Sequence, residues 1–176
     1  IPPAMVKFAS SLRFDKAVSI CTVIGFPLGY NTHKTKMYEI SDAIEKGADH
    51  IDLVINNSII KDAAWDRFDA EMAEYRKACS GKILKIIVET SIITRNELDR
   101  IAQTLVNNGI DYIKTSTGMV GDGAKLDDIK FLKEYYGNKI KIKASGGIKT
   151  KEQVLEFIEA GADKIGTSSA KQILEN

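Results

Sequence analysis

The sequence has few of the residues that mark secreted, metal-binding or membrane proteins. Its 176 residues include two cysteines and two histidines, and no stretch resembles a membrane-spanning segment or a signal peptide. Two cysteines without metal-site spacing indicate buried or free thiols in a reducing compartment, so we expect a cytoplasmic protein. His33 and His50 have no neighbouring residues that would complete a metal site or a catalytic triad, so we expect structural or surface roles for them.

The charge pattern also excludes some partners. The chain carries 25 basic and 24 acidic side chains, a net charge of +1, and has no basic stripe interleaved with aromatic residues. Nucleic acid and membrane are therefore not expected partners. With 44% hydrophobic residues and no linker or low-complexity segment, residues 1–176 are expected to form a single globular domain.

A short phrase, Gly-x-Asp-x-Ile, occurs three times and ends on a different residue each time. Its copies are GADHID at 47–52, GIDYIK at 109–114 and GADKIG at 161–166. Each copy follows a helical pattern, with Gly at the position that ends a helix, and begins a short apolar run. A repeated helix, glycine stop and strand predicts an α/β protein with a parallel sheet. The last residue of each copy, Asp52, Lys114 or Gly166, is a candidate for chemistry.

Apolar runs bounded by turn residues predict six short strands. They cover residues 19–26, 50–56, 82–89, 111–116, 140–144 and 164–167.

Amphipathic stretches between these runs predict helices. They cover residues 5–12, 34–46, 62–78, 97–107, 126–136 and 152–160. Capping boxes formed by Thr94 with Glu97 and by Thr150 with Gln153 mark two starts. The buried face of the helix at 34–46 is predicted to carry Met37, Ile40, Ser41 and Ile44.

Small polar clusters follow nearly every predicted strand, which favours a (β/α)8 barrel over a doubly wound sheet. Six strands are fewer than eight, and the chain opens at Ile1-Pro2-Pro3 with a helix directly after. We therefore expect a TIM barrel of which this chain holds about six βα units and lacks the first two strands and the first helix.

Two lysines end predicted neighbouring strands, Lys114 and Lys143. At equal height on strands about 4.8 Å apart, two ammonium groups repel each other, and repulsion with desolvation would lower the pKa of a lysine towards neutrality. A neutral amine is the form that attacks a carbonyl to give a Schiff base. Asp52 adds a carboxylate that can transfer protons. The alternative to a Schiff-base role is that Lys114 and Lys143 pair with carboxylates or reach solvent.

Glycine and hydroxyl residues end the last two predicted strands. Ser145-Gly146-Gly147 and Gly166-Thr-Ser168-Ser169 lie where barrel enzymes bind phosphate through backbone N–H groups. A pair of such clusters indicates a phosphate-bearing ligand, although each alone also suits a tight turn.

Together these motifs resemble the deoxyribose-phosphate aldolase family, class I aldolases of (β/α)8 fold. The resemblance runs over the chain in order, through CTVIGFPLG at 21–29, KIIVET at 85–90, IKTSTG at 113–118, KASGGI at 143–148 and GTSS at 166–169. It implies reversible cleavage of 2-deoxy-D-ribose 5-phosphate to D-glyceraldehyde 3-phosphate and acetaldehyde, without a metal or other cofactor. It also implies a homodimer.

The resemblance assigns a role to each matching residue. Lys114 would form the Schiff base, Lys143 would perturb it, and Asp52 would relay protons through a water. The phosphate would be held by Gly118, Gly146, Gly147, Lys149, Gly166, Ser168 and Ser169.

Two other hypotheses remain open. One is an inactive barrel fragment whose unpaired sheet edges associate with another copy. The other is a different sugar-phosphate-binding barrel enzyme, an epimerase or isomerase, which would share the glycine clusters but would not need the lysine pair.

Overall fold

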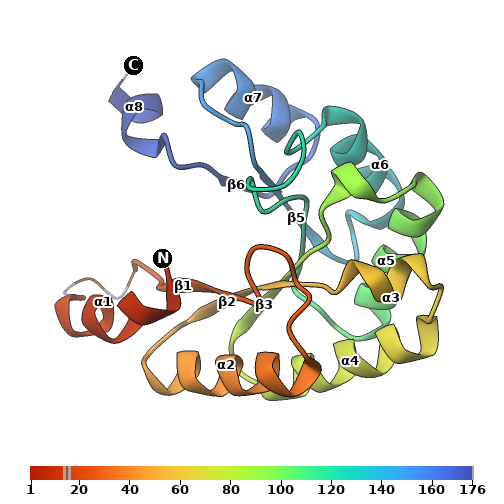
Figure 1. Cartoon of the computed structure of the whole chain (residues 1–176). Coiled ribbons are helices and arrows are strands. Elements are labelled where there is room, and N and C mark those ends of the chain that lie inside the picture. The colour runs from red at the N-terminus through yellow and green to blue at the C-terminus, as the bar shows by residue number, and fades with distance from the viewer. Residues whose placement is uncertain (14, 16, 176) are drawn as a thin grey trace. The chain divides into compact units, whose positions relative to one another are not determined.

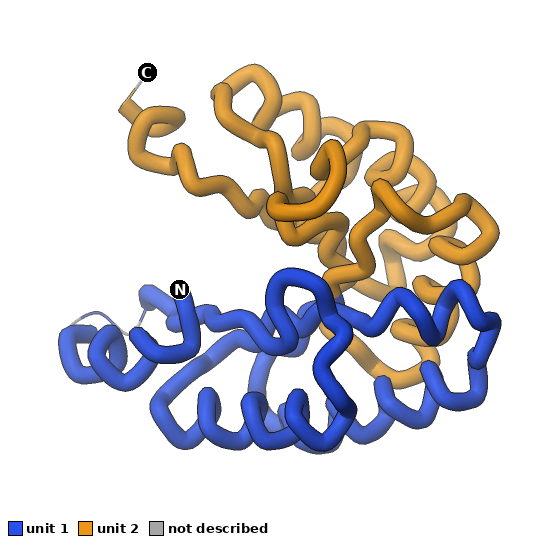
Figure 2. Tube along the Cα trace, viewed as in Figure 1, with its two compact units in different colours: residues 1–86 blue, residues 87–176 orange. Residues whose placement is uncertain are grey.

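The structure is a computed structural model that describes residues 1–13, 15 and 17–175. The chain divides into two compact units, residues 1–86 and 87–176, coloured blue and orange in Figure 2.

The first unit alternates parallel strands with helices (Figure 1). Within it, β1 and β2 pair in parallel, with Cys21 opposite His50 and Ile24 opposite Leu53. Its elements are η1 (Pro3–Met5), α1 (Val6–Leu12), β1 (Cys21–Ile24), α2 (His33–Glu45), β2 (His50–Val54), α3 (Asn57–Lys61), α4 (Trp65–Ala78) and β3 (Ile83–Ile87), whose last residue opens the second unit.

The second unit repeats the same alternation. Its middle strand β5 pairs in parallel with β4 on one side and β6 on the other. The elements are η2 (Thr90–Ile92), α5 (Arg95–Asn107), β4 (Tyr112–Lys114), α6 (Leu126–Tyr136), β5 (Lys141–Ser145), α7 (Lys151–Glu159), β6 (Lys164–Gly166) and α8 (Ala170–Glu175).

The aspartate of the Gly-x-Asp-x-Ile repeat fixes the register between neighbouring strands. In the first unit, the backbone N–H of Asp49 donates to the carbonyl of Ile20 (2.9 Å), and its carboxylate accepts from the N–H of Ile20 (2.8 Å). In the second unit, Asp163 makes the same two bonds to Ile142, both at 2.8 Å. The repeat is therefore a register device as well as a helix stop.

All six predicted strands are confirmed, each shorter than predicted at one end or both except β5, which begins and ends one residue later. The predicted helices are also confirmed, and α6 has the predicted bounds. Both capping boxes form, since Thr94 accepts from the N–H of Glu97 and Thr150 accepts from the N–H of Gln153, with the reciprocal side-chain bonds. Local capping chemistry thus sets these two starts.

Two helices were not predicted, α3 and α8. The side chain of Asn56 caps α3 by accepting from the N–H of Ser58 (3.1 Å). Ala63 then adopts a left-handed backbone (φ 52°), which separates α3 from α4. The helix predicted at 62–78 therefore begins only at Trp65.

The predicted buried face of α2 is confirmed only in part, since Ile40 is buried and Met37 and Ile44 are half-buried. Its buried residues are Lys36, Ile40 and Ala43, whereas Ser41 is exposed. Lys36 is 1% exposed and its ammonium donates to the carbonyl of Val54 (2.8 Å). A lysine that was not predicted to be buried thus lies on the inner face of α2, because a backbone carbonyl at the end of β2 accepts its hydrogen bond.

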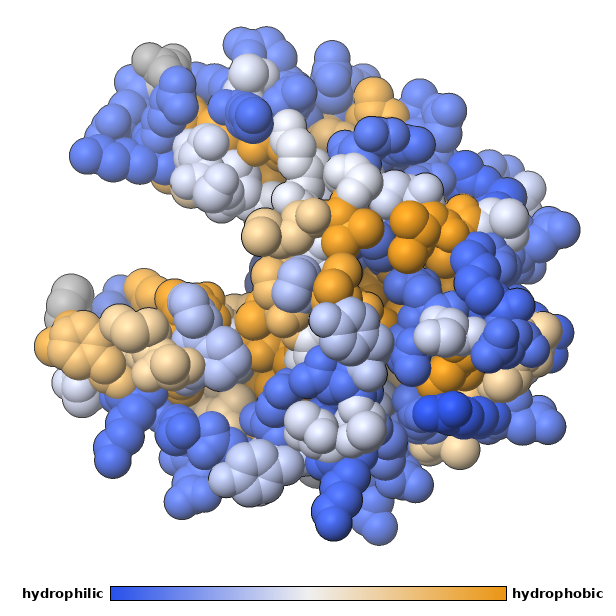
Figure 3. Space-filling model, in the orientation of Figure 1, coloured by the Kyte–Doolittle hydropathy of each residue, from blue (hydrophilic) through white to orange (hydrophobic). Residues whose placement is uncertain are grey.

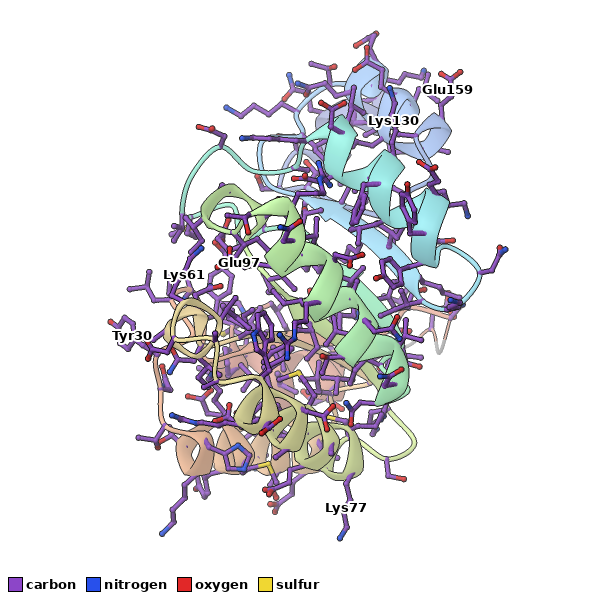
Figure 4. All side chains as sticks on the ribbon, turned by 90° about the vertical axis from the view of Figure 1, so that its right-hand side faces the viewer. Tyr30, Lys61, Lys77, Glu97, Lys130 and Glu159 are labelled. Carbon is purple, nitrogen blue, oxygen red and sulfur yellow. The ribbon has the colours of Figure 1, made fainter. Side chains whose placement is uncertain are left out.

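The cores of both units are built from the apolar faces of these helices and the β-branched residues of the strands. Fully buried examples are Ile51, Leu53 and Phe68 in the first unit and Ile113 and Ile142 in the second. Charged residues occupy the outer helix faces, as Lys77 on α4 and Lys130 on α6 show in Figure 4. This pattern matches strands covered by amphipathic helices.

Beside the N-terminus, the first unit leaves apolar side chains open to solvent (Figure 3). Phe8 and Leu12 of α1 are 57% and 56% exposed, and together with Val18 they line a groove of about 540 Å³. Among the residues that the structure describes, no helix is both long enough and apolar enough to span a membrane.

Burial of Lys36 predicts a pH dependence of stability. Desolvation lowers the pKa of Lys36 from 10.5 to about 8, and Glu71 and Glu39 only partly oppose this. Between these two values the unfolded chain holds a proton that the folded chain has released, so the free energy of unfolding should rise with pH by roughly 3 kcal/mol in all. Below about pH 8 the folded chain carries the full cost of the buried ammonium.

We expect Lys36→Met to remove this rise, and Lys34→Met, at an exposed position of the same helix, to leave it in place. Urea unfolding at several pH values through this window measures the difference between each variant and the original chain. Equal pH slopes for the original chain and Lys36→Met would contradict the assignment.

Candidate functional site

A cavity of about 350 Å³ lies at the carboxyl ends of β4, β5 and β6, within the second unit. Lys114, the last residue of β4, is 7% exposed and lines this cavity. The other lining residues are Thr117, Gly118, Met119, Ser145, Gly146, Gly147, Ile148, Lys149, Gly166, Thr167 and Ser168. The cavity therefore combines one nearly buried lysine with three strand-end turns.

Three lysines lie in one row across the strands of the second unit. The register pairs Lys114 with Lys143, and Lys143 with Lys164. The equal height of Lys114 and Lys143, which the sequence analysis expected, is thus the observed register. Lys164, for which no role was predicted, extends the row onto β6.

Gly166 leaves room for the side chain of Lys143. A Cβ atom at Gly166 would lie 3.1 Å from Cε of Lys143 and 2.8 Å from Cβ of Ser145. Real Cβ atoms essentially never approach as closely as the second distance, so any larger residue would displace one of these neighbours. The final glycine of the third repeat therefore allows the lysine of β5 to lie across β6.

Hydroxyl groups join the strand ends to one another. Thr115 donates to the carbonyl of Ser145 and accepts from its N–H, both at 3.1 Å. Ser145 in turn donates to the carbonyl of Ser116 (2.5 Å). The hydroxyl of Thr167, which follows β6, donates to the carbonyl of Ile148 in the turn after β5 (2.6 Å). These hydroxyls are structural ties between turns.

Left-handed glycines bring the turns after β4 and β5 into backbone contact. Gly118, Gly146 and Gly147 have φ values of 77°, 89° and 77°. A Cβ at Gly146 would lie 2.9 Å from Cα of Gly123 and 3.2 Å from Cα of Gly118. Among the described residues, none accepts a hydrogen bond from the N–H groups of Gly118, Gly146 or Gly147. The cavity thus presents backbone donors with no protein acceptor, as an anion site requires.

One predicted phosphate ligand lies outside this cavity. Ser169 lines a neighbouring groove with Lys171 and Gln172, and its N–H donates to the hydroxyl of Thr167 (3.0 Å). Ser169 was predicted as a phosphate ligand, but its N–H is already bonded to Thr167 within the protein.

Asp52 lies in the first unit, in a buried cluster on its three strands. Its carboxylate pairs with the ammonium of Lys85 (2.9 Å), and the two side chains are 2% and 1% exposed. The thiol of Cys21 lies 3.2 Å from Asp52 and 3.6 Å from Lys85. The expected aspartate is therefore part of an ion pair whose lysine the sequence analysis did not single out.

Two polar residues outside these sites contact neighbouring side chains. A structural or surface role was expected for His33, and no role was predicted for Lys141. His33 bonds to Glu74 (2.7 Å) and contacts the ring of Tyr75. Lys141 is exposed, with its ammonium over the ring of Tyr112. In the part of the chain that the structure describes, no three or more His, Cys, Asp or Glu side chains form a group that could hold a metal ion.

Parallel strands with covering helices, and a strand-end cavity that combines a lysine with glycine amides, define the class as an α/β-barrel protein with an amine-containing site. A family model described as "DeoC/LacD family aldolase" matches residues 5–175. The chain belongs to this aldolase family.

Curated relatives match the whole chain. A deoxyribose-phosphate aldolase of Clostridioides difficile is 49% identical over 176 residues, which are 100% of this chain and 80% of the relative. A protein of the same name from Ureaplasma urealyticum is 46% identical over 100% of this chain and 82% of its own length.

Solved structures agree on the fold. An aldolase named QR15 has a TM-score of 0.92 at 39% identity, covering 99% of this chain and 80% of its own. A deoxyribose phosphate aldolase of Aeropyrum pernix, described as a tetramer, has a TM-score of 0.90 at 32% identity, covering 99% and 74%. The predicted α/β-barrel fold class is confirmed.

The backbone contact at Gly146 predicts a specific cost of substitution. Gly146→Ala would suffer both the left-handed φ and the collision with Gly123 and Gly118. Gly109→Ala suffers only the first, because Gly109 is also left-handed (φ 62°) but a Cβ there would meet nothing within 4 Å. We expect Gly146→Ala to lower the free energy of unfolding by about 1–3 kcal/mol more than Gly109→Ala does. Urea unfolding of both variants checks this, and equal losses would show that the turns can separate freely.

Proposed function

We propose that the chain is a class I aldolase that reversibly cleaves 2-deoxy-D-ribose 5-phosphate to D-glyceraldehyde 3-phosphate and acetaldehyde. The observation that carries the proposal is the cavity of the second unit, where Lys114 and the amides of Gly118, Gly146 and Gly147 line one space. A substrate with a carbonyl at one end and a phosphate at the other suits a cavity that is lined by both an amine and an anion site. The names of the relatives support the same substrate.

In this mechanism the neutral amine of Lys114 adds to the C1 aldehyde of the open-chain sugar, and loss of water gives an iminium ion. The iminium accepts the electron pair of the C2–C3 bond while the C3 hydroxyl loses its proton. A three-carbon aldehyde phosphate leaves, and the remaining two-carbon enamine takes a proton at C2. Hydrolysis then releases acetaldehyde and regenerates the amine.

Lys143 is proposed to favour the neutral form of Lys114, since the register makes them neighbours on adjacent strands. The proton transfers are assigned to Asp52 on its sequence motif alone. Phosphate binding is assigned to six residues that line the cavity, Gly118, Gly146, Gly147, Lys149, Gly166 and Ser168. It is also assigned to Ser169, which lines the neighbouring groove and whose N–H is bonded to Thr167.

Residues 1–176 are proposed to form one barrel domain that needs no cofactor. The same proposal includes a place in the cytoplasm, which was expected from the two thiols. It also includes a role in deoxyribonucleotide breakdown and assembly into a homodimer, which come from the family resemblance. The mass of the protein in solution tests the homodimer.

The first prediction for this function concerns the nucleophile. Incubation with acetaldehyde and borohydride should leave a reduced ethyl adduct on Lys114, because borohydride reduces an imine to a stable amine. Lys114→Leu should lose the adduct and cleavage, whereas Lys141→Leu, at an exposed position of β5, should keep both. Peptide mass mapping locates the adduct. Folded protein without an adduct on Lys114 would refute the aldolase mechanism for this chain.

The second concerns Lys143. Lys143→Met should slow adduct formation at neutral pH by about tenfold, because Lys114 would lose a neighbouring positive charge that disfavours its protonation. The loss should diminish as the pH is raised, since deprotonation then no longer depends on Lys143. A rate deficit of the same size at every pH would instead indicate a change in shape at the site.

A further inference from the structure

Glu89 follows β3 and is buried beneath the turn that follows β4, with both segments in the second unit. Its side chain is 2% exposed. One carboxylate oxygen accepts from the N–H of Thr117 (3.0 Å) and from the hydroxyl of Thr117 (2.6 Å), and the other lies 3.4 Å from the hydroxyl of Ser91. A carboxylate is costly to bury, so these bonds indicate a defined task at this turn.

The backbone of Glu89 is strained in a way that aims this carboxylate. Its φ of 56° lies in the left-handed region, which a residue with a long side chain rarely occupies. Such a conformation persists where the surroundings enforce it, and here the N–H of Thr90 donates to the carbonyl of Thr115 (2.9 Å). The segment after β3 is thereby held against the end of β4, with the side chain of Glu89 directed at Thr117.

Thr117 connects Glu89 to the backbone that lines the cavity. Its hydroxyl donates to Glu89 and accepts from the N–H of Met119 (3.1 Å). The two bonded residues, Thr117 and Met119, flank Gly118 on both sides. The orientation of the Gly118 peptide, whose N–H has no acceptor among the described residues, therefore depends on Glu89 through the backbone N–H and the hydroxyl of Thr117.

We propose that Glu89 is a positioning residue for the phosphate end of the site, acting through Thr117 to fix the amide of Gly118. The inference rests on the proposed function and extends it to a residue outside the cavity wall. Lys114 lies before this turn, at the end of β4, and its backbone is held by strand pairing with β5. Loss of the Glu89–Thr117 bond therefore impairs binding of the phosphate and leaves the amine in place.

The two ends of the substrate can be probed separately. Acetaldehyde reports on Lys114 alone, because it has no phosphate, whereas 2-deoxyribose 5-phosphate engages both ends. For each probe, the concentration that gives half-maximal borohydride trapping on Lys114 is measured. Inorganic phosphate binding, measured by calorimetry, reports on the anion site without any imine chemistry.

Two pairs of variants isolate the hydrogen bonds. Thr117→Val keeps the shape of the side chain and removes the hydroxyl, and Thr117→Ser keeps the hydroxyl. Glu89→Ala removes the acceptor, and Glu89→Gln keeps one oxygen that can accept both bonds from Thr117. Thr104→Val is a control, because the hydroxyl of Thr104 bonds to a carbonyl within α5.

Thr117→Val and Glu89→Ala should raise the half-maximal concentration of the sugar phosphate by about tenfold or more and weaken inorganic phosphate binding in parallel. Trapping by acetaldehyde should stay within about twofold of the original chain. Thr117→Ser and Glu89→Gln should resemble the original chain with both probes, because they keep the hydrogen bonds between residues 89 and 117. Thr104→Val should also resemble it, because Thr104 makes no contact with these bonds. If Glu89→Ala does not fold, the Thr117 pair carries the test.

Equal losses with both probes, or no loss in Thr117→Val, would overturn the inference. Absence of trapping on Lys114 in the original chain would overturn the proposed function instead. In that case phosphate binding still decides the inference: weaker binding in Thr117→Val supports it, and equal binding, or no binding to the original chain, overturns it.

Discussion

The register between parallel strands is the constraint on which the rest of the structure depends. A shift by one residue would turn every side chain of a strand to its other face, so Lys114 and Lys143 share a row only if the register is fixed. Asp49 fixes the register between β1 and β2, and Asp163 fixes that between β5 and β6, each with paired bonds to the start of the preceding strand. The repeat therefore marks helix ends and also sets the height at which Lys143 faces Lys164 and Ser145 faces Gly166.

Contacts at the strand ends are made mostly by hydroxyl and backbone groups. Thr115, Ser145 and Thr167 join neighbouring turns by hydrogen bonds, and Gly146 lets two backbones touch. The hydroxyls of Thr115, Ser145 and Thr167 are thus committed to the protein, whereas the N–H groups of Gly118, Gly146 and Gly147 have no acceptor among the described residues. Backbone amides recognise phosphate by the shape and direction of the donors, and they add no charge beside Lys114, the proposed nucleophile.

Much of this arrangement was predictable from sequence, because strands, caps and glycine stops are local signals. The six strands and both capping boxes depend on neighbouring residues alone. The inner position of Lys36 was not predictable, since its burial depends on a carbonyl 18 residues away in sequence. Lys85 and Glu89 were missed for the same reason: the partner of Lys85, Asp52, lies on another strand, and the partner of Glu89, Thr117, lies in the turn after β4. Hydrophobic periodicity ranks a charged residue as exposed, and only tertiary hydrogen bonds reverse that ranking.

Buried side-chain atoms without a hydrogen-bond partner mark positions that lower the stability of the fold. Four buried side-chain atoms of the described residues lack a hydrogen-bond partner, and two of them, the hydroxyls of Thr90 and Ser116, are adjacent in sequence to Glu89 and Thr117. An orphaned buried hydroxyl costs free energy, and a left-handed glutamate adds to the cost. A turn selected for stability alone would place apolar residues at such positions. Departures from local rules concentrate at functional sites, so the strain at Glu89 and the orphaned hydroxyls beside it point to the same turn that orients Gly118.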